Sequence, residues 1–388
     1  MKRYGNIYEK IYGIDNLRLA YNKAKKDKSF YKEVQIVDDN LDYYLDQIQY
    51  MLKNKTYKVC SDDYTMFEKM DKGKLRKIFK LNFFPHRIIQ HALLNQIQEI
   101  YIKNYIDNTF ASIPNRGIHL ALKRLDTALI SDVENTQYCL QIDVRKFYPS
   151  INHEINKKQY RRKFKDDDLL WLIDMLIDSL CLDNNGNKIN PLDVKSEDRK
   201  GIAIGALFSQ FDGNFNLSPL DHWLKEEKKV KYLFRYCDDV VILGKTKEEL
   251  HQLRHEIEIY LKKELRLDLK DNYQIYNIET RGIDFVGYRH FRNYILLRKS
   301  TSKRLIRKMR NIQNKINKGG QLTDSDWCSI NSYKGWMKWG NCHNLYIKWI
   351  KPLEHHCEQY YKNNIKKIKN DSNESQMNKE YYKKFKQN

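Results

Sequence analysis

The sequence predicts an α+β fold, and three local patterns support this prediction. In "LDYYLDQIQYMLKNKTY" (41–57) apolar residues recur at i, i+3, i+4 and i+7, the spacing of an amphipathic helix. "QYCLQID" (137–143) is a short apolar run typical of a buried strand, and it ends in an aspartate. "RYCDDVVIL" (235–243) places two aspartates between apolar runs, which indicates a strand, a turn and a second strand. An acid-ended strand and an acidic hairpin, mixed with helices, make an α+β core.

The other elements of the first half follow in chain order. Residues 1–70 are predicted to be helical and polar. "KGKLRKIFKLNFF" (72–84) alternates basic and apolar residues and predicts a strand pair that carries cations. "HRIIQHALLNQIQEIYIKNY" (86–105) has the pattern of a long amphipathic helix.

In the second half of the chain, helices are predicted within 153–181, followed by a loop at 182–193. The glycine-rich segment 201–210 leads into a further helix. Beyond the acidic hairpin, the pattern predicts a helix at 247–265 and a strand pair within 282–300. The rest of the chain is helical and strongly basic in pattern, and it ends in a low-complexity tail.

The charge of the chain predicts a polyanionic partner. Its 388 residues, enough for two or three packed domains, include 71 Lys and Arg against 50 Asp and Glu, a net charge of +21. Nucleic acid is the usual partner of such a chain, and a membrane surface is the alternative. The sequence has no apolar run long enough to span a bilayer, no signal peptide and no lipidation motif. We therefore expect a cytoplasmic protein without a membrane partner.

Asp143, Asp238 and Asp239 are the residues most indicative of chemistry. Each adjoins a hydrophobic strand, where an unpaired charge is costly to desolvate. Two like charges about 4 Å apart repel by roughly 4 kcal/mol at an effective dielectric constant near 20. Taken singly, these residues are explained by turn formation and by the end of a strand. Taken together on adjacent strands, they offer hard oxygen ligands for two Mg²⁺ ions, which would stabilise the attacking and leaving oxygens of a phosphoryl displacement.

Five segments resemble, in the same order, the sequence blocks of reverse transcriptases. They are "KLRKIFKLNFFPHRIIQHAL" (74–93), similar to the fingers region; "DVRKFYPSI" (143–151), similar to the first catalytic box; "GIAIGALFSQ" (201–210), similar to the glycine-rich box; "YCDD" (236–239), similar to the Tyr-x-Asp-Asp box; and "IDFVGYRHF" (283–291), similar to the exit from the palm. The order and spacing of these segments match over roughly residues 65–300.

The resemblance implies an α+β right-hand polymerase, in which the palm is an antiparallel sheet with helices and the thumb is helical and basic. The implied parts are an N-terminal helical extension (1–65), fingers (66–135), a palm (136–290) with a fingers-like insertion around 153–200, a thumb (291–365) and a basic low-complexity tail (366–388). The implied activity is RNA-directed DNA polymerisation, with template RNA, an RNA–DNA heteroduplex and dNTPs as partners.

The resemblance also implies roles for individual residues. The catalytic carboxylates are Asp143, Asp238 and Asp239, and the ligands of two Mg²⁺ ions, for which Mn²⁺ can substitute, are Asp143, Val144, Asp238 and Asp239. The nucleotide-binding residues are Lys74, Arg76, Arg87, Tyr148, Ile204, Gly205 and Gln210. Lys270 is a candidate general acid, although we expect it to be a solvated surface lysine. Solvated surface positions are the alternative for the three cations, and a core aromatic is the alternative for Tyr148.

The glycine-rich box departs from the commoner pattern and points to a subtype. Retroviral and group II intron enzymes carry Gln-Gly at its start and Ser-Pro at its end, whereas this chain has Ile204-Gly205 and Ser209-Gln210. This form resembles the reverse transcriptases of diversity-generating retroelements and related bacterial enzymes, antiphage ones included. An alkyl group at position 204 removes a hydrogen-bonding group beside the nascent base pair, which would loosen base selection.

Three functions remain open. The first is a diversity-generating reverse transcriptase, bacterial or phage-encoded, that copies template RNA into cDNA with errors at adenines and has a small basic accessory protein as partner. The second is a defence-associated relative that makes cDNA or untemplated DNA against phage. The third is a non-catalytic RNA-binding relative. The intact set of Asp143, Asp238 and Asp239 disfavours the third, because a binding protein gains nothing from buried anionic repulsion. We expect the first.

Overall fold

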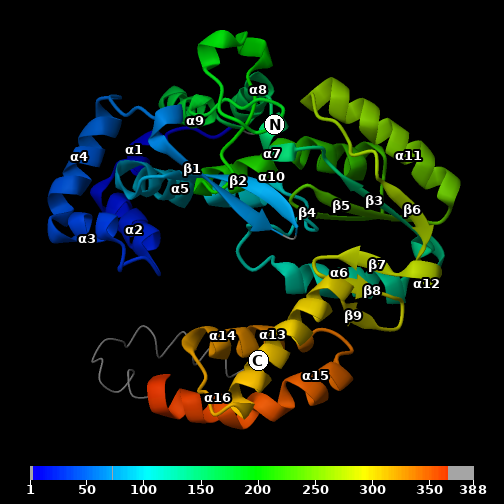
Figure 1. The fold of residues 1–388 in the computed structure, drawn as a ribbon. Coiled ribbons are helices and arrows are strands. Elements are labelled where there is room, and N and C mark those ends of the chain that lie inside the picture. Colours follow the sequence, from blue (N-terminus) through cyan, green and yellow to red (C-terminus); the bar gives the residue numbers. More distant parts are fainter. Residues whose placement is uncertain (1–2, 72, 366–388) are drawn as a thin grey trace. The chain divides into compact units, whose positions relative to one another are not determined.

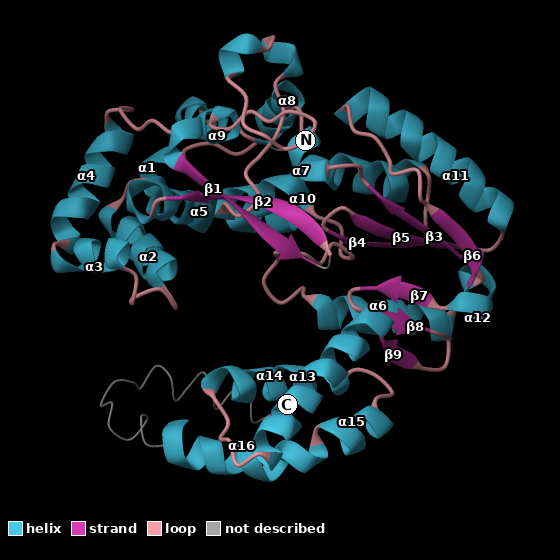
Figure 2. Cartoon of the chain, in the orientation of Figure 1, coloured by secondary structure: helices cyan, strands magenta, loops and turns pink. Residues whose placement is uncertain are grey.

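The computed structural model describes residues 3–71 and 73–365, without the side chains of Asp71, Lys74 and Ile365. The tail expected at 366–388 lies outside the described residues. The chain forms two compact units, Met1–Thr280 and Arg281–Asn388. Their helices and antiparallel strands confirm the α+β prediction (Figure 2). The boundaries expected between fingers, palm and thumb stay predictions.

The first unit begins with helices and a two-stranded hairpin. The helices are α1 (Tyr8–Ile11), α2 (Ile14–Lys25), α3 (Lys32–Asp39) and α4 (Leu41–Lys53). The helical prediction for 1–70 is wrong after this point, because β1 (Tyr64–Asp71) pairs antiparallel with β2 (Lys74–Leu81). The strand pair predicted within 72–84 is therefore only the second half of a pair that starts earlier. The sequence hides β1 because side chains such as Met66, Phe67 and Met70 are exposed, so burial imposes no alternation on them.

The middle of the first unit is mainly helical. Its helices are α5 (Ile88–Asn104), α6 (Ile118–Ser131), α7 (Phe147–Ser150), α8 (His153–Lys163), α9 (Asp167–Asp178) and α10 (Leu207–His222). Helix α5 packs against α2 and α10. The predicted amphipathic character of α5 is wrong, because Ile88, Ile89, Leu93, Leu94 and Ile97 are all buried and cover most of its circumference. A helix that is apolar on most sides belongs to the interior.

A four-stranded antiparallel sheet in the order β4-β5-β3-β6 carries the predicted catalytic aspartates, Asp143 and Asp239 on its strands and Asp238 in the turn between β4 and β5. Its strands are β3 (Tyr138–Asp143), β4 (Tyr232–Tyr236), β5 (Asp239–Gly244) and β6 (Gln274–Asn277), and α11 (Lys247–Tyr260) runs along the sheet (Figure 1). Leu140 and Ile142 of β3 lie opposite Ile242 and Val240 of β5, and all four pack with Leu217 of α10. This apolar face fixes the register of β3 against β5, because a slip of one residue would turn Gln141 into it in place of Leu140 and Ile142.

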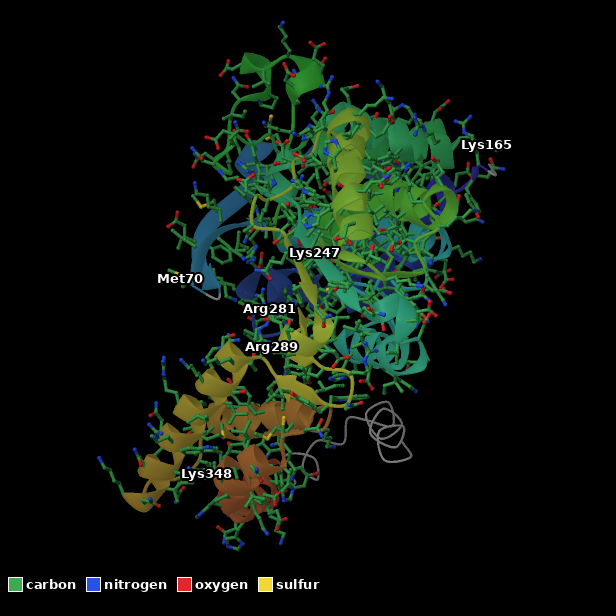
Figure 3. All side chains as sticks on the ribbon, turned by 90° about the vertical axis from the view of Figure 1, so that its right-hand side faces the viewer. Met70, Lys165, Lys247, Arg281, Arg289 and Lys348 are labelled. Carbon is green, nitrogen blue, oxygen red and sulfur yellow. The ribbon has the colours of Figure 1, made fainter. Side chains whose placement is uncertain are left out.

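The second unit combines a small sheet with basic helices. Where the sequence predicts two strands, the structure has a three-stranded antiparallel sheet of β7 (Ile283–Phe285), β8 (Tyr288–His290) and β9 (Ile295–Leu297). After α12 (Ile278–Arg281) and this sheet come α13 (Lys299–Asn317), α14 (Asp324–Met337), α15 (His343–Trp349) and α16 (Glu354–Tyr360). Lys348 is an exposed residue of α15 (Figure 3). Across residues 3–71 and 73–365, no helix is both long and apolar enough to cross a membrane.

The glycine-rich segment docks on the edge of β2. The backbone N–H of Phe79 donates to the Ile204 carbonyl over 2.7 Å. Gly205 follows with φ +112°, and a Cβ at this position would lie 2.8 Å from Ile78 Cγ2. The positive φ and the close approach both require glycine. Gly205 thus lets the backbone come close to β2, an element that the sequence did not link to this segment.

Gly205→Ala is expected to lower the free energy of unfolding by about 1–3 kcal/mol, because the added Cβ strains the backbone and collides with Ile78. Gly117→Ala is the matched control, since its φ is −97° and a Cβ there meets nothing within 4 Å. Urea unfolding measures both variants. Equal losses of stability in the two variants would show that the docking on β2 does not constrain Gly205.

Candidate active site

Asp143 and Asp238 meet at one end of the central sheet. β3 ends at Asp143, whose partner across the sheet is Asp239, the first residue of β5. Asp238 lies in the turn between β4 and β5, directly after Cys237, whose φ of +56° is left-handed. The Asp143 and Asp238 carboxylates are within hydrogen-bonding reach of each other. The register of β3 and β5 therefore brings together two acids that are far apart in the sequence.

The electrostatics of this pair are unfavourable in the absence of a counter-charge. Burial and the neighbouring Asp143 charge raise the pKa of Asp238 to about 6. Asp143 Oδ1 is buried and has no hydrogen-bond partner among the described residues. A buried carboxylate oxygen without a partner is costly, and more so beside a second carboxylate. The arrangement therefore favours either a shared proton or a bound cation.

Lys270 partly neutralises the pair. Its backbone N–H donates to the Asp143 carbonyl over 2.9 Å, and its ammonium group contacts Asp143 Oδ2. The solvated position favoured for Lys270 is wrong, because its side chain is only 28% exposed and is paired with the carboxylate. An antiparallel bridge between Val144 and Leu269 brings the two segments together, and this long-range pairing leaves no local pattern in the sequence.

The carboxylate pair fits a divalent cation. Carboxylate oxygens are the ligands that Mg²⁺ prefers, and a cation between them would offset their repulsion. The buried Asp143 Oδ1 supplies a ligand atom that no protein group uses within the described part of the chain. However, no three Asp, Glu, His or Cys side chains in residues 3–71 and 73–365 are grouped closely enough to hold a metal ion. The structure thus joins Asp143 to Asp238, while the ligand roles of Asp239 and Val144 stay predictions.

Tyr148 lies beside the turn that carries Asp238. Its side chain lies close to Cys237 and Asp238, and burial, with these two neighbours, raises the pKa of Tyr148. Gly213 of α10 packs against this segment, since a Cβ there would come within 3.2 Å of Phe147 Cε1 and into ordinary contact with the Tyr148 ring at 3.5 Å. The ring is half-buried rather than enclosed in the core. Sequence reasoning missed Cys237 and Gly213 because their contacts join segments distant in the chain.

The predicted nucleotide-binding cations have different surroundings. Arg76 is exposed on β2, and the side chain of Lys74 lies outside the described residues. Arg87 has Glu33 and Lys28 of the N-terminal helical region as its charged neighbours. Arg76 is thus exposed, and the charged neighbours of Arg87 are not the aspartate pair.

Ile204 and Gln210 lie towards the two ends of the glycine-rich segment. Ile204 is half-buried and is tied to β2 through its carbonyl. Gln210 is exposed in the first turn of α10, where its amide oxygen accepts a hydrogen bond from the Ser112 hydroxyl over 3.4 Å. The backbone that carries each side chain is therefore held in place, by β2 at Ile204 and by α10 at Gln210.

Comparison with known proteins identifies the family. Residues 67–290, which include Asp143, Asp238 and the glycine-rich segment, match the reverse transcriptase (RNA-dependent DNA polymerase) family. The chain belongs to the reverse transcriptase family. This match confirms the polymerase fold and the family predicted from the sequence blocks. The prediction of the diversity-generating subtype is finer than the family and is taken up as a proposal below.

This reverse transcriptase has distant relatives. It is 22% identical to protein YkfC of Escherichia coli K12 over 254 residues, which are 57% of this chain and 64% of that protein. It is also similar to a solved structure of apo telomerase from Candida tropicalis, with a TM-score of 0.45 and 11% identity over 69% of this chain and 50% of that one. The chain thus spans less than two thirds of the length of either of these two proteins.

With a metal chelator present, ionisation of Asp238 is expected to lower the free energy of unfolding of the reverse transcriptase as the pH rises from about 4 to about 6. The folded protein holds the Asp238 proton more tightly than the unfolded chain, because the pKa is about 6 against 3.8. Asp238→Asn removes this contribution, so we expect the variant to exceed the wild type in unfolding free energy by the order of 1–3 kcal/mol at about pH 7, and by much less at about pH 4. Chemical denaturation at both pH values is the measurement. A variant that is less stable than the wild type at the higher pH would contradict the repulsion between the two aspartates.

Proposed function

We propose that this chain is an RNA-directed DNA polymerase that transfers nucleotides with two bound Mg²⁺ ions, for which Mn²⁺ can substitute. The observation that supports it most is the approach of Asp143 to Asp238, with a buried carboxylate oxygen that lacks a partner among the described residues. Bound ions of this kind stabilise the attacking and leaving oxygens of a nucleotidyl transfer. Asp143 and Asp238 would hold them, and Asp239 and Val144 would complete the ligands.

The residues around the aspartates have separate tasks in this proposal. Tyr148, beside Cys237 and Asp238, would stand against a ribose 2′-hydroxyl and so select dNTPs. Lys270 holds its ammonium group at the Asp143 carboxylate, from where it would protonate the leaving pyrophosphate. Arg76, exposed on β2, would bind triphosphate oxygens through its planar fork of donors.

The second unit offers a basic surface that suits an RNA-containing duplex. Along α13, Leu305 and Met309 are buried, whereas a set of cations is exposed. These cations are Lys303, Arg304, Arg307 and Arg310. A-form duplexes are recognised mainly through backbone phosphates and shape, and such contacts make binding sensitive to salt. The placement of the cations supports template RNA and its heteroduplex as partners.

We further propose that the enzyme is of the diversity-generating type and copies template adenines with low fidelity. Ile204 stands where retroviral and group II intron enzymes have Gln, and Gln210 stands where they have Pro. The alkyl group of Ile204 offers no hydrogen bond to the nascent base pair, so a mismatched base meets a smaller penalty. A small basic accessory protein would be a partner of such an enzyme.

Incorporation of dNTPs on a primed RNA template is expected to require Mg²⁺ and to fall by roughly 100-fold or more in Asp238→Ala, because the lost carboxylate removes stabilisation of charge in the transition state. Asp42→Ala is the control, since Asp42 forms a surface pair with Arg18 and its side chain is 77% exposed. Primer extension measures both variants. Full activity in Asp238→Ala, or no activity in the wild type supplied with its RNA and accessory protein, would disprove the catalytic proposal.

Sequencing the cDNA tests the subtype. We expect errors concentrated opposite template adenines in the wild type, and roughly tenfold fewer of them in Ile204→Gln, because the amide restores a hydrogen-bonding group beside the base pair. Ile204→Leu, which keeps an alkyl side chain, is the control and should retain the errors. A uniform low error rate in the wild type would refute the diversity-generating role, and untemplated homopolymer would favour the defence-associated alternative.

A further inference from the structure

Arg235 is one of the largest fully buried side chains among the described residues. It lies on β4, in the strand that leads directly into the turn with Asp238. Burying a guanidinium is costly unless its charge is paired and its donors are all used. The surroundings of Arg235 meet both conditions, which indicates that the residue is held in one orientation.

Every N–H group of the Arg235 side chain donates a hydrogen bond. Nε donates to both carboxylate oxygens of Asp221 at 2.8 Å, and Nη2 donates to Asp221 Oδ2 at 2.5 Å and to the Asn214 carbonyl at 3.2 Å. Nη1 donates to Asn214 Oδ1 at 3.1 Å and to the Cys237 carbonyl at 2.9 Å. Because a guanidinium side chain has five N–H groups, these bonds use its full capacity.

The acceptors of Arg235 belong to a rigid frame. Asp221 and Asn214 are both buried on α10. The Asn214 amide also donates to the Ala111 carbonyl over 2.6 Å. The Arg235 backbone accepts from Phe110 N–H over 3.0 Å and donates to the carbonyl of residue 108 over 2.9 Å. Through its guanidinium and its backbone, Arg235 thus joins a helix and a connecting segment to the strand before the active-site turn.

The bond to Cys237 links this frame to the aspartate pair. Cys237 has φ +56°, a left-handed conformation that is costly for a residue with a side chain, and Asp238 follows it. We propose that Arg235 is a positioning residue, which holds the Cys237 carbonyl and so fixes the turn that presents Asp238 to Asp143. This inference deepens the proposed function and rests on it for the catalytic role of Asp238. A lysine cannot replace Arg235, because a compact ammonium group cannot bond Asp221 and Cys237 in the same geometry.

The rate at which N-ethylmaleimide labels the Cys237 thiol reports on the order of this turn. The labelling is done with a chelator present, so that no metal contributes, and is followed by mass spectrometry. In the wild type the thiol is half-buried beside Tyr148, so labelling should be slow. We expect Arg235→Lys to label about tenfold or more faster, because the lost hydrogen bond frees the turn. Asn214→Ala removes one acceptor of Nη1 but keeps the Arg235–Asp221 pair, and we expect it to label several-fold faster even if Arg235→Lys does not fold.

Leu45→Ala is the control, since it removes part of a fully buried side chain of α4 and lowers stability away from the turn. Equal acceleration in this control, or unchanged labelling in both test variants, would overturn the positioning role. Primer extension run in parallel should show a lower kcat for Asn214→Ala with little change in KM for dNTP. An inactive wild type would refute the proposed function, whereas the labelling rates would still decide the role of Arg235 in the turn.

Discussion

The closeness of two half-buried carboxylates, Asp143 and Asp238, is the constraint on which the architecture of the central sheet depends. Burial and mutual repulsion penalise their charged forms, which is why the pKa of Asp238 rises to about 6. The Lys270 ammonium at Asp143 offsets part of this penalty. Asp143 Oδ1, which has no hydrogen-bond partner among the described residues, can accept a further ligand such as a cation. The apolar face shared by β3, β5 and α10 holds the register, so the core keeps the acids together against their repulsion.

The main acids were predictable because their signals are local. Asp143 ends an apolar strand and Asp238 lies between two apolar runs. Both patterns can be recognised from the neighbouring residues alone. Lys270 was placed wrongly in solvent, since its contact depends on the bridge between Val144 and Leu269, which joins distant segments. Strand β1 was missed because its exposed side chains show no alternation, and only pairing with β2 makes it a strand. Local chemistry is thus visible in the sequence, whereas long-range pairing is not.

The structure also suggests how catalytic geometry and base selection are kept separate. The guanidinium of Arg235 ties the Cys237 carbonyl to α10, and so restrains the turn that carries Asp238. The carbonyl of Ile204 is tied to Phe79 of β2, so the glycine-rich segment has its own support. With both backbones restrained, the side chain at position 204 can change in chemistry without moving the aspartates. The proposed loss of fidelity would therefore leave the pair of Asp143 and Asp238 in place.

Direct binding of Mn²⁺, followed by electron paramagnetic resonance, tests the claim that Asp143 and Asp238 hold cations for nucleotidyl transfer. The wild type, Asp143→Asn and Asp238→Asn are compared in the presence of an RNA template, a chain-terminated DNA primer and dNTP. We expect two ions per wild-type chain, and an affinity lower by roughly 10–100-fold or more in each variant, because an anionic ligand is replaced by a neutral amide. Wild-type affinity for Mn²⁺ in both variants, or no binding in the wild type, would contradict the cation site.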